Sequence, residues 1–364
     1  MRIVLAAEGT RGDLQPLIEL GARLLAARHD VVLCGPPDFA APAEGRGVRF
    51  VSCGTSFRDF LRENAHALEG SAVRAFGEGM RFLRLHFETR LATLLELARG
   101  ADLVIGAGAE ASATIAAEAH GVPYRYLVYC PGMLPSREHG PVFAPWPSLS
   151  PGANRLLWPV VTKAIDWTVG RLVGPARRRL GLPRGGSFYR RLLGERPFVA
   201  VDAALAPVPR DCPLPVDQVP SLHPLEGDPL PAKLGAFLES GPAPVYLGFG
   251  SMPDPDPAAT TRLLVDAVTR AGCRALIGSG WADLGGGPLP EGVMAVGAVS
   301  HPSLFARCAA VVHHGGAGTT TTAARAGVPQ VVIPHIADQV TVADSFDVLH
   351  RFVQLKLRLR FGSA

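Results

Sequence analysis

The sequence predicts an α/β protein with two domains in tandem. With 364 residues, the chain is longer than one hydrophobic core usually serves. Short β-branched runs alternate with helical stretches from the first residue onward, as they do in βαβ units around a parallel sheet. The alternation stops at eight prolines within residues 207–231 and then starts again. We therefore expect an N-terminal domain over 1–206, a proline-rich linker without regular structure over 207–231 and a C-terminal domain over 232–364.

Apolar runs indicate the strands of both domains. In the first domain they are Arg2–Ala7, Asp30–Cys34, Val48–Cys53, Leu103–Ala107 and Tyr124–Tyr129. In the second they are Val245–Phe249, Ala275–Ile277, Val293–Val299, Ala310–His313 and Val331–Ile333. Helical spacing of apolar residues from Leu14 to Leu25 predicts a first helix that begins just after Gly12 and Asp13. Further helices are expected near Ala258–Ala271 and from Gly318.

The composition excludes several classes of protein. Hydrophobic residues make up 48% of the chain, which is too many for a disordered protein. The net charge is only +4 and forms no basic stripe, so no nucleic acid partner is expected. The six cysteines lack metal-ligand spacing, which favours free thiols in a cytoplasmic protein. Pro159, Lys163 and Asp166 interrupt the apolar stretch Leu156–Val173, which predicts an amphipathic or buried helix and no membrane span.

The strongest chemical signal is the run from Val311 to Thr320, VVHHGGAGTT. A buried strand opens here through a glycine-rich turn into a helix of small residues. Glycines let the backbone approach an anion, and the helix N-terminus offers unpaired N–H groups. His313 and His314 can both donate to phosphate oxygens. The run predicts a diphosphate site, and a purely structural turn is the alternative.

Three further loops follow predicted strands. Leu247–Met252 and Pro334–Gln339 both lie where open α/β sheets bind ligands, beyond the carboxyl ends of strands. An ordinary turn and a helix cap are the alternatives for these two. Gly9–Asp13 is the corresponding loop of the first domain. Asp13 is either the N-cap of the first helix or a general base.

Together with Gly297–Pro302 and Ala326–Gln330, these loops carry a family resemblance. They are similar to the inverting glycosyltransferases of family one. The resemblance is greatest to the bacterial branch that decorates glycopeptide, macrolide and polyketide natural products, to which sterol glucosyltransferases are related. It runs from residue 1 to about residue 340 and is most specific over 297–339. It implies the GT-B fold, in which two Rossmann-like domains face each other across a cleft, the first binding the acceptor and the second the nucleotide sugar.

The resemblance also implies roles for individual residues. Asp13 matches the proposed catalytic base, and His314 matches the histidine that contacts the donor diphosphate. The remaining matches are residues that bind the donor. They contact phosphate through hydroxyls (Thr10, Ser251), form the phosphate turn (Gly315, Gly316, Gly318, Thr319), lie at the nucleobase (Val296, Val299) or bind the sugar hydroxyls (Asp338, Gln339).

The implied reaction moves a hexose from a UDP- or TDP-sugar to a hydroxyl of a hydrophobic aglycone, with inversion and without a cofactor or metal ion. Asp254-Pro255-Asp256 has the letters of an Asp-x-Asp metal site, but its proline favours a turn. Aromatic residues within 55–90 and 130–185 suit a bulky apolar acceptor, although core packing explains them as well.

Two other functions remain open. One is a nucleotide-sugar 2-epimerase, which needs no acceptor. The other is a non-catalytic protein that binds a nucleotide sugar or activates a partner, because only 25 residues follow Gln339 and the C-terminal domain looks short for the family. The alternation of apolar and polar residues from His350 to Phe361 predicts a strand that could pair with a protein partner.

Overall fold

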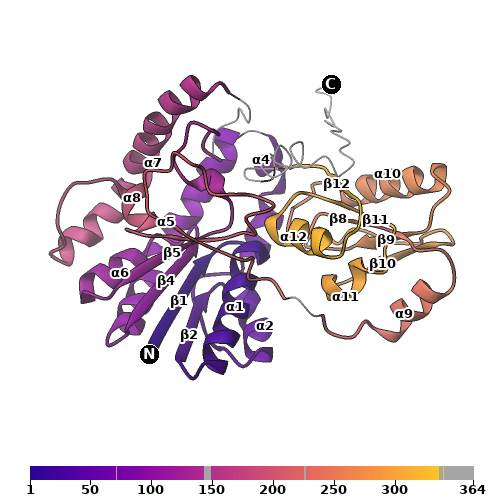
Figure 1. Cartoon of the computed structure of the whole chain (residues 1–364), viewed down its shortest axis with the longest axis horizontal. Helices are drawn as coiled ribbons and strands as arrows, with labels where there is room; N and C mark the ends of the chain where they lie inside the picture. The colour runs from indigo at the N-terminus through magenta and orange to yellow at the C-terminus, as the bar shows by residue number, and fades with distance from the viewer. Residues whose placement is uncertain (71, 143–148, 225–226, 336–338, 340–364) are drawn as a thin grey trace. The chain divides into compact units, whose positions relative to one another are not determined.

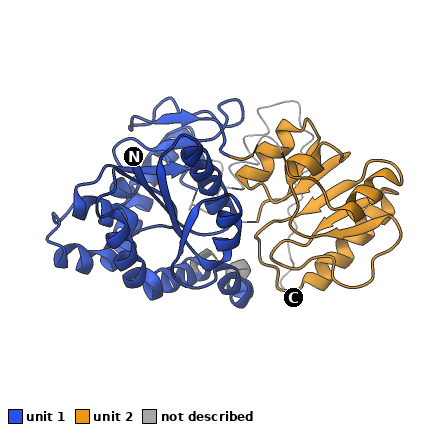
Figure 2. Cartoon of the chain, turned by 90° about the horizontal axis from the view of Figure 1, so that it is seen from below, with its two compact units in different colours: residues 1–222 blue, residues 223–364 orange. Residues whose placement is uncertain are grey.

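The chain forms two compact units, each with its own parallel sheet. The computed structural model describes residues 1–70, 72–142, 149–224, 227–335 and 339. The first unit is Met1–Leu222 and the second is His223–Ala364 (Figures 1 and 2). The prediction of two α/β domains in tandem is confirmed. The division falls inside the proline-rich stretch, and the expected strand at His350–Phe361 lies outside the described residues.

In the first unit, the described strands form a seven-stranded sheet in the order β3-β2-β1-β4-β5-β6-β7. Every neighbouring pair is parallel. The central strand β1 is almost completely buried, which is typical of a parallel sheet with both faces covered by helices. The strands are β1 (Arg2–Glu8), β2 (Asp30–Gly35), β3 (Arg49–Ser52), β4 (Leu103–Gly108), β5 (Tyr124–Val128), β6 (Phe198–Ala200) and β7 (Asp217–Val219).

The helices of this unit include two long ones, α5 and α7 (Figure 1). The predicted helix over Leu156–Val173 is part of α7. No helix among the described residues is long and apolar enough to cross a membrane. The helices are α1 (Arg11–Ala26), α2 (Ala40–Gly45), α3 (Phe57–Glu63), α4 (Ala65–Gly70), α5 (Ala72–Ala98), α6 (Ala113–His120), α7 (Pro151–Arg179) and α8 (Phe188–Leu193), with short 3-10 turns at Pro37–Phe39 and Pro131–Met133.

The proline-rich stretch is not a bare linker, and the expectation of no regular structure there is wrong. It contributes β7, the edge strand of the first sheet, which pairs with β6. Gln218 of β7 holds this strand to the segment after β6. Its side-chain amide donates to Val201 O at 3.1 Å and to Ala206 O at 2.9 Å. An edge strand tolerates nearby prolines, since one side of it forms no ladder.

In the second unit, the described strands form a five-stranded sheet in the order β10-β9-β8-β11-β12. Its elements are α9 (Ala232–Glu239), β8 (Val245–Gly248), α10 (Pro257–Arg270), β9 (Ala275–Gly278), β10 (Val293–Val296), α11 (His301–Phe305), β11 (Ala310–His313), α12 (Ala317–Arg325) and β12 (Gln330–Val332). The five predicted strands are all present. Only β10 is clearly shorter than expected, because its partner β9 has just four residues to pair with it.

The order of the strands places one ligand-binding position in each sheet. Chain order reverses between β1 and β4 in the first sheet and between β8 and β11 in the second. Loops that leave neighbouring strands in opposite directions open a crevice at their carboxyl ends, where α/β proteins bind ligands. Three of the four loops predicted to carry chemistry follow β1, β8 and β11, so they lie at these two positions, whereas Pro334–Gln339 follows β12.

Candidate functional site

In the second unit, the loops after β8 and β11 meet at the strand reversal. Gly248 at the end of β8 is in register with His313 at the end of β11. Gly250 follows with a φ of +63°, and a Cβ on it would lie 3.0 Å from His314 Cε1. The backbone of the loop after β8 therefore packs directly on the His314 imidazole. Position 250 needs a glycine because its φ is positive and because a side chain there would press on this ring.

His313 has a structural role in the glycine-rich turn. It is completely buried, its Nδ1 accepts the Gly315 N–H at 3.1 Å, and its Nε2 lies 2.9 Å from Gln330 Oε1. These two contacts require the neutral tautomer with the proton on Nε2. Burial agrees with this, because it lowers the pKa of His313 to about 4. The expectation that both histidines donate to phosphate is therefore wrong for His313, whose two nitrogens are already used.

His314 is the histidine available to a ligand. It is 8% exposed, and its Nδ1 has no hydrogen-bond partner among the described residues. Burial above all, together with the nearby His313, His335 and His301, lowers the pKa of His314 to about 3. A buried polar atom without a partner is uncommon and calls for an explanation. A neutral imidazole here can donate one hydrogen bond to a bound anion.

The two buried histidines make stability depend on pH. An unfolded histidine has a pKa of about 6.5, whereas these two stay neutral in the folded chain until far lower pH. The unfolded state therefore binds more protons between pH 6.5 and 4, and stability falls as the pH is lowered through that range. We expect a loss of about 1 kcal/mol per pH unit for each histidine. His313→Gln is expected to give a shallower fall in melting temperature.

The exposed His66 provides the control for this measurement. His66→Gln is expected to keep the wild-type dependence of melting temperature on pH. An unchanged dependence in His313→Gln would show that His313 is not held neutral by the fold.

The glycine-rich turn leads into α12 with the geometry expected of an anion site. Gly315 has a φ of +92°, and Gly316 is the N-cap of α12. Gly318 lies in the first turn, where any Cβ would overlap the ring of His223. Thr319 is half-buried beside it. Sequence reasoning gave His223 no role, because it is far from Gly318 along the chain and only the fold brings the two together.

The remaining donor-side residues predicted from the sequence lie in the loops after β8 and β12. Ser251 is buried in the loop after β8. Gln339 is 3% exposed, and its amide links two loops by accepting from His335 N at 2.8 Å and donating to Met252 Sδ at 3.1 Å. Its partner Asp338 lies outside the described residues.

The proposed nucleobase position rests on the segment after β10. Val296 packs in the core of the unit, and its carbonyl accepts from Ser279 N at 2.8 Å. Val299 is half-buried at the edge of the same core. The segment Asp254–Asp256 forms the predicted turn, in which Asp254 Oδ1 accepts from Asp256 N and Asp256 caps α10.

In the first unit, Asp13 follows β1 in the first turn of α1. Helix α1 begins at Arg11, and Thr10 is its N-cap. Asp13 accepts from Thr10 N at 2.8 Å, which completes a capping box. The prediction that the helix begins after Asp13 is therefore wrong, and so is the alternative in which Asp13 is its N-cap. The spacing of Thr10 and Asp13 is that of a capping box, which predicts the observed start of the helix after Thr10.

Two glycines make room for the Asp13 carboxylate. Gly108, at the end of β4, has a φ of +63°, and a Cβ there would lie 3.0 Å from Asp13 Oδ1 and overlap the Glu8 carbonyl oxygen. A Cβ on Gly9, whose φ is +151°, would overlap Asp13 Oδ2. The carboxylate is therefore held against the backbone at the reversal between β1 and β4. The Tyr129 hydroxyl also donates to the Asp13 carbonyl at 2.7 Å.

Substituting Gly108 is expected to disturb this arrangement. Gly108→Ala puts a Cβ at positive φ, which costs about 1–2 kcal/mol, and also forces it against Glu8 and Asp13. Gly121→Ala is the matched control, because Gly121 has a φ of +64° with open space around it. Chemical denaturation is expected to show a larger loss of stability for Gly108→Ala. Equal losses would mean that the packing against Asp13 is unimportant.

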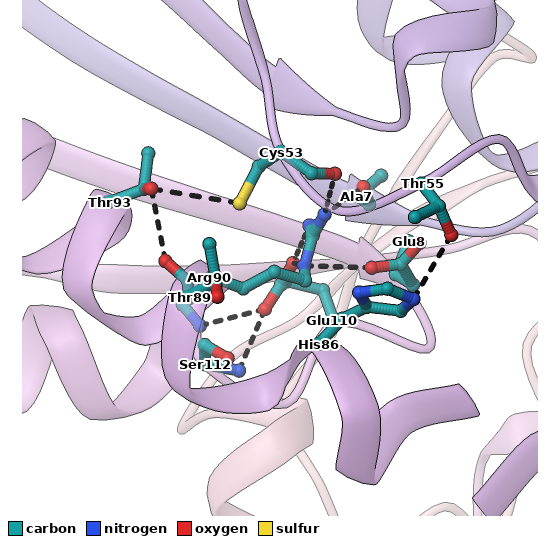
Figure 3. A network of polar contacts seen from close by, with 11 residues as sticks. Ala7, Glu8, Cys53, Thr55, His86, Thr89, Arg90, Thr93, Glu110 and Ser112 are labelled. Carbon is teal, nitrogen blue, oxygen red and sulfur yellow. Dashed lines mark hydrogen bonds and ion pairs between the residues drawn. The ribbon is translucent and has the colours of Figure 1, made fainter. Parts of the chain in front are cut away.

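A buried network of charges lies beside Asp13, and sequence reasoning did not identify it (Figure 3). Arg90 of α5 lies between Glu8 at the end of β1 and Glu110 after β4, and each of the three is at most 3% exposed. Their positions are far apart in the sequence and give no signal. Only the fold brings them together.

Five of the aromatic residues within 55–90 and 130–185 lie in two places, whereas Phe76 and Trp167 are exposed. Phe57, Phe60 and Phe82 pack on one another, and Phe82 also contacts His86 with ring centroids 4.6 Å apart. Trp158, in contrast, belongs to the main core of the unit, as does Phe87. Core packing therefore accounts for part of the aromatic residues that were considered for acceptor binding.

Comparison with known protein families matches both units. Residues 3–135 match the glycosyltransferase family 28 N-terminal domain, and residues 282–349 match the erythromycin biosynthesis protein CIII-like C-terminal domain. The vancomycin aglycone glucosyltransferase of Amycolatopsis orientalis is 37% identical over 352 residues, which cover 93% of this chain and 82% of that protein. The dTDP-epi-vancosaminyltransferase of the same organism is 34% identical, and the alignment covers 93% of this chain and 81% of that protein.

Solved structures agree with the fold. The glycosyltransferase VinC in complex with dTDP superposes with a TM-score of 0.64 at 23% identity, covering 98% of this chain and 87% of that one. The glycosyltransferase of kitacinnamycin gives a TM-score of 0.65 at 20% identity, with 98% and 86% covered. The two parallel-sheet units thus correspond to the GT-B architecture. The chain belongs to the GT-B glycosyltransferases of natural-product biosynthesis, the group that contains the vancomycin-type enzymes.

Proposed function

We propose that this glycosyltransferase inverts the anomeric centre as it moves a hexose from a UDP- or TDP-sugar to a hydroxyl of a hydrophobic aglycone. The observation that carries the proposal is the position of the two predicted sites. Asp13 lies at the strand reversal of the first sheet and His314 at that of the second. Each is where an α/β sheet binds its ligand.

The second unit is proposed to hold the donor diphosphate. The N–H groups at the start of α12 and the neutral His314 would donate to its oxygens, with Ser251 in the neighbouring loop. They would also stabilise the charge that develops on the leaving diphosphate. The relatives named for glucosyl and dTDP-linked sugar transfer support a nucleotide hexose as donor.

The first unit is proposed to hold the acceptor, with Asp13 as general base. Its carboxylate would take the proton of the acceptor hydroxyl as the oxygen attacks the anomeric carbon from the face opposite the nucleotide. This attack converts an α-linked donor into a β-glycoside. We propose that the reaction needs no metal ion and takes place in the cytoplasm, where the six free cysteines would remain reduced.

Incubation with a panel of UDP- and TDP-sugars and glycopeptide, polyketide and phenolic acceptors tests the proposal. Mass spectrometry is expected to show a hexosylated product, its NMR spectrum a β linkage, and EDTA no effect on the rate. Failure to form a product or hydrolyse a donor, with donor binding retained, would favour the non-catalytic alternative. A manno isomer formed from UDP-N-acetylglucosamine alone would instead identify an epimerase.

A further inference from the structure

Helix α7 exposes a row of apolar side chains on the surface of the first unit. Seven large apolar side chains are exposed among the described residues, and three of them belong to α7. These are Leu156, Val160 and Trp167, which are 74%, 63% and 64% exposed. Their spacing of four and seven residues puts them on one face of the helix. Isolated exposed apolar residues are ordinary in proteins, whereas several together mark an interaction surface.

Positively charged side chains lie on the same face of α7. Lys163 and Arg171 lie four residues before and after Trp167, Arg178 follows seven residues later, and all three cations are exposed. The Arg171 guanidinium carbon lies 4.9 Å from the centroid of the Trp167 ring. The expectation that the basic residues form no stripe is therefore wrong for this helix. We call this row the α7 face, which consists of Leu156, Val160, Lys163, Trp167, Arg171 and Arg178.

No acidic side chain of α7 balances these cations. Asp166 is the one acid in the helix, and its Oδ1 accepts from Ser187 Oγ at 3.0 Å and from Tyr189 N at 2.9 Å. Arg179 is paired with Glu88 of α5, whereas no ion pair among the described residues involves the three cations of the α7 face. The sequence from 151 to 200 contains ten basic and two acidic residues, so its charge of +8 exceeds the +4 of the whole chain. The α7 face is thus complementary to an anionic surface.

We propose that the α7 face binds the surface of an anionic lipid membrane. A lipid surface offers negative headgroups to the cations and, directly beneath them, hydrocarbon to the apolar side chains. Tryptophan, lysine and arginine suit this boundary because each combines an apolar part with a polar end. A protein partner would need acidic and apolar side chains in the matching order along a convex helix, whereas a fluid lipid surface adapts to it.

In this arrangement α7 lies on the membrane and does not cross it. The opposite side of the helix packs in the main core of the unit through Trp158, Val169 and Val173. None of the described helices is apolar enough over its length to span a bilayer. Only the outward side chains enter the headgroup region, so the fold is kept. Binding through exposed cations is reversible and screened by salt.

Sedimentation with phospholipid vesicles tests the proposal on the wild type. Binding to phosphatidylcholine vesicles that contain phosphatidylglycerol is expected to be at least about tenfold tighter than to pure phosphatidylcholine vesicles. The preference is expected to disappear in about 1 M sodium chloride, where the Debye length is about 3 Å. Absence of binding to the anionic vesicles, or binding that salt does not weaken, would overturn the proposal.

A pair of matched charge variants locates the binding surface. Each cation near an anionic membrane contributes about fivefold in affinity, so Lys163→Gln with Arg171→Gln is expected to bind the anionic vesicles about 25-fold more weakly. Arg262→Gln with Arg270→Gln is the control, because it removes the same charge from the exposed side of α10. The control is expected to bind like the wild type. Equal losses in the two variants would show attraction by the net charge alone and overturn the assignment to α7.

Trp167→Ser tests the apolar part of the α7 face. The wild-type tryptophan emission is expected to move to shorter wavelength when anionic vesicles are added, because the Trp167 ring leaves water. Trp167→Ser is expected to lose this shift and to bind more weakly, while the net charge is unchanged. An equal shift and equal binding in Trp167→Ser would mean that the ring does not enter the lipid and would contradict the proposal.

The same samples without lipid distinguish the other occupant of such a face, a second copy of this chain. A wild type that does not bind vesicles and forms dimers in light scattering, which Trp167→Ser abolishes, would assign the α7 face to self-association and refute the membrane. All the substituted side chains are exposed, so the variants are expected to keep the wild-type fold and melting temperature. None of these measurements depends on the proposed reaction, because neither sugar donor nor acceptor is present.

Discussion

Replacing Asp13 by Asn is expected to lower the rate of glycosyl transfer by about 10²–10⁴, which is the usual contribution of a general base. The substitution removes the basic oxygen, but Asn Oδ1 can still accept the Thr10 N–H that Asp13 accepts at 2.8 Å. Helix α1 should therefore remain capped, since its N-cap Thr10 is unchanged and the capping-box bond from Thr10 N is kept. Steady-state rates at saturating donor, together with the melting temperature, are the required measurements.

Asp59 provides a matched control for Asp13→Asn. It occupies the third position of α3, after the N-cap Ser56, as Asp13 does in α1 after Thr10. Asp59→Asn is expected to leave transfer unchanged, whereas Asp13→Ala is expected to lose both transfer and, with the bond from Thr10 N, about 1 kcal/mol of stability. Wild-type transfer by Asp13→Asn would remove Asp13 from the mechanism and leave it only the role of capping α1.

Replacing His314 by Ala is expected to weaken both donor binding and turnover. The imidazole is buried and its Nδ1 has no partner among the described residues, so it is available to donate to the diphosphate. Loss of such a donor at a site of developing negative charge costs about 10²–10³ in rate. Calorimetric titration with TDP and the steady-state rate report the two effects separately.

His120→Ala is the control for this substitution, because His120 lies in the last turn of α6 in the first unit and bonds only to the Leu95 carbonyl among the described residues. It is expected to bind TDP and turn over like the wild type. Loss of a diphosphate contact worth about 1.4 kcal/mol would weaken TDP binding about tenfold. A TDP affinity of His314→Ala within about twofold of the wild type would therefore exclude such a contact.

Local sequence patterns specify the architecture and the loops of interest. Parallel strands buried on both faces, such as β1, must be continuous apolar runs, and the helices between them must show helical spacing. These local patterns located two sheets and the glycine-rich turn before α12. These patterns specify the element boundaries less well. With the Thr10–Asp13 capping box, α1 begins before Asp13 and not after it, and the Gln218 hydrogen bonds hold part of the proline-rich stretch against the first sheet.

The roles of the polar side chains, in contrast, depend on how the folded chain brings them together. His313 and His314 are adjacent in the sequence, yet one has both nitrogens engaged and the other has a buried nitrogen without a partner among the described residues. Glu8, Arg90 and Glu110 come from separate elements, so no local pattern links them. Hydrogen bonding and charge compensation depend on which groups the fold brings within about 3 Å of one another, and sequence spacing does not specify that distance for residues so far apart along the chain.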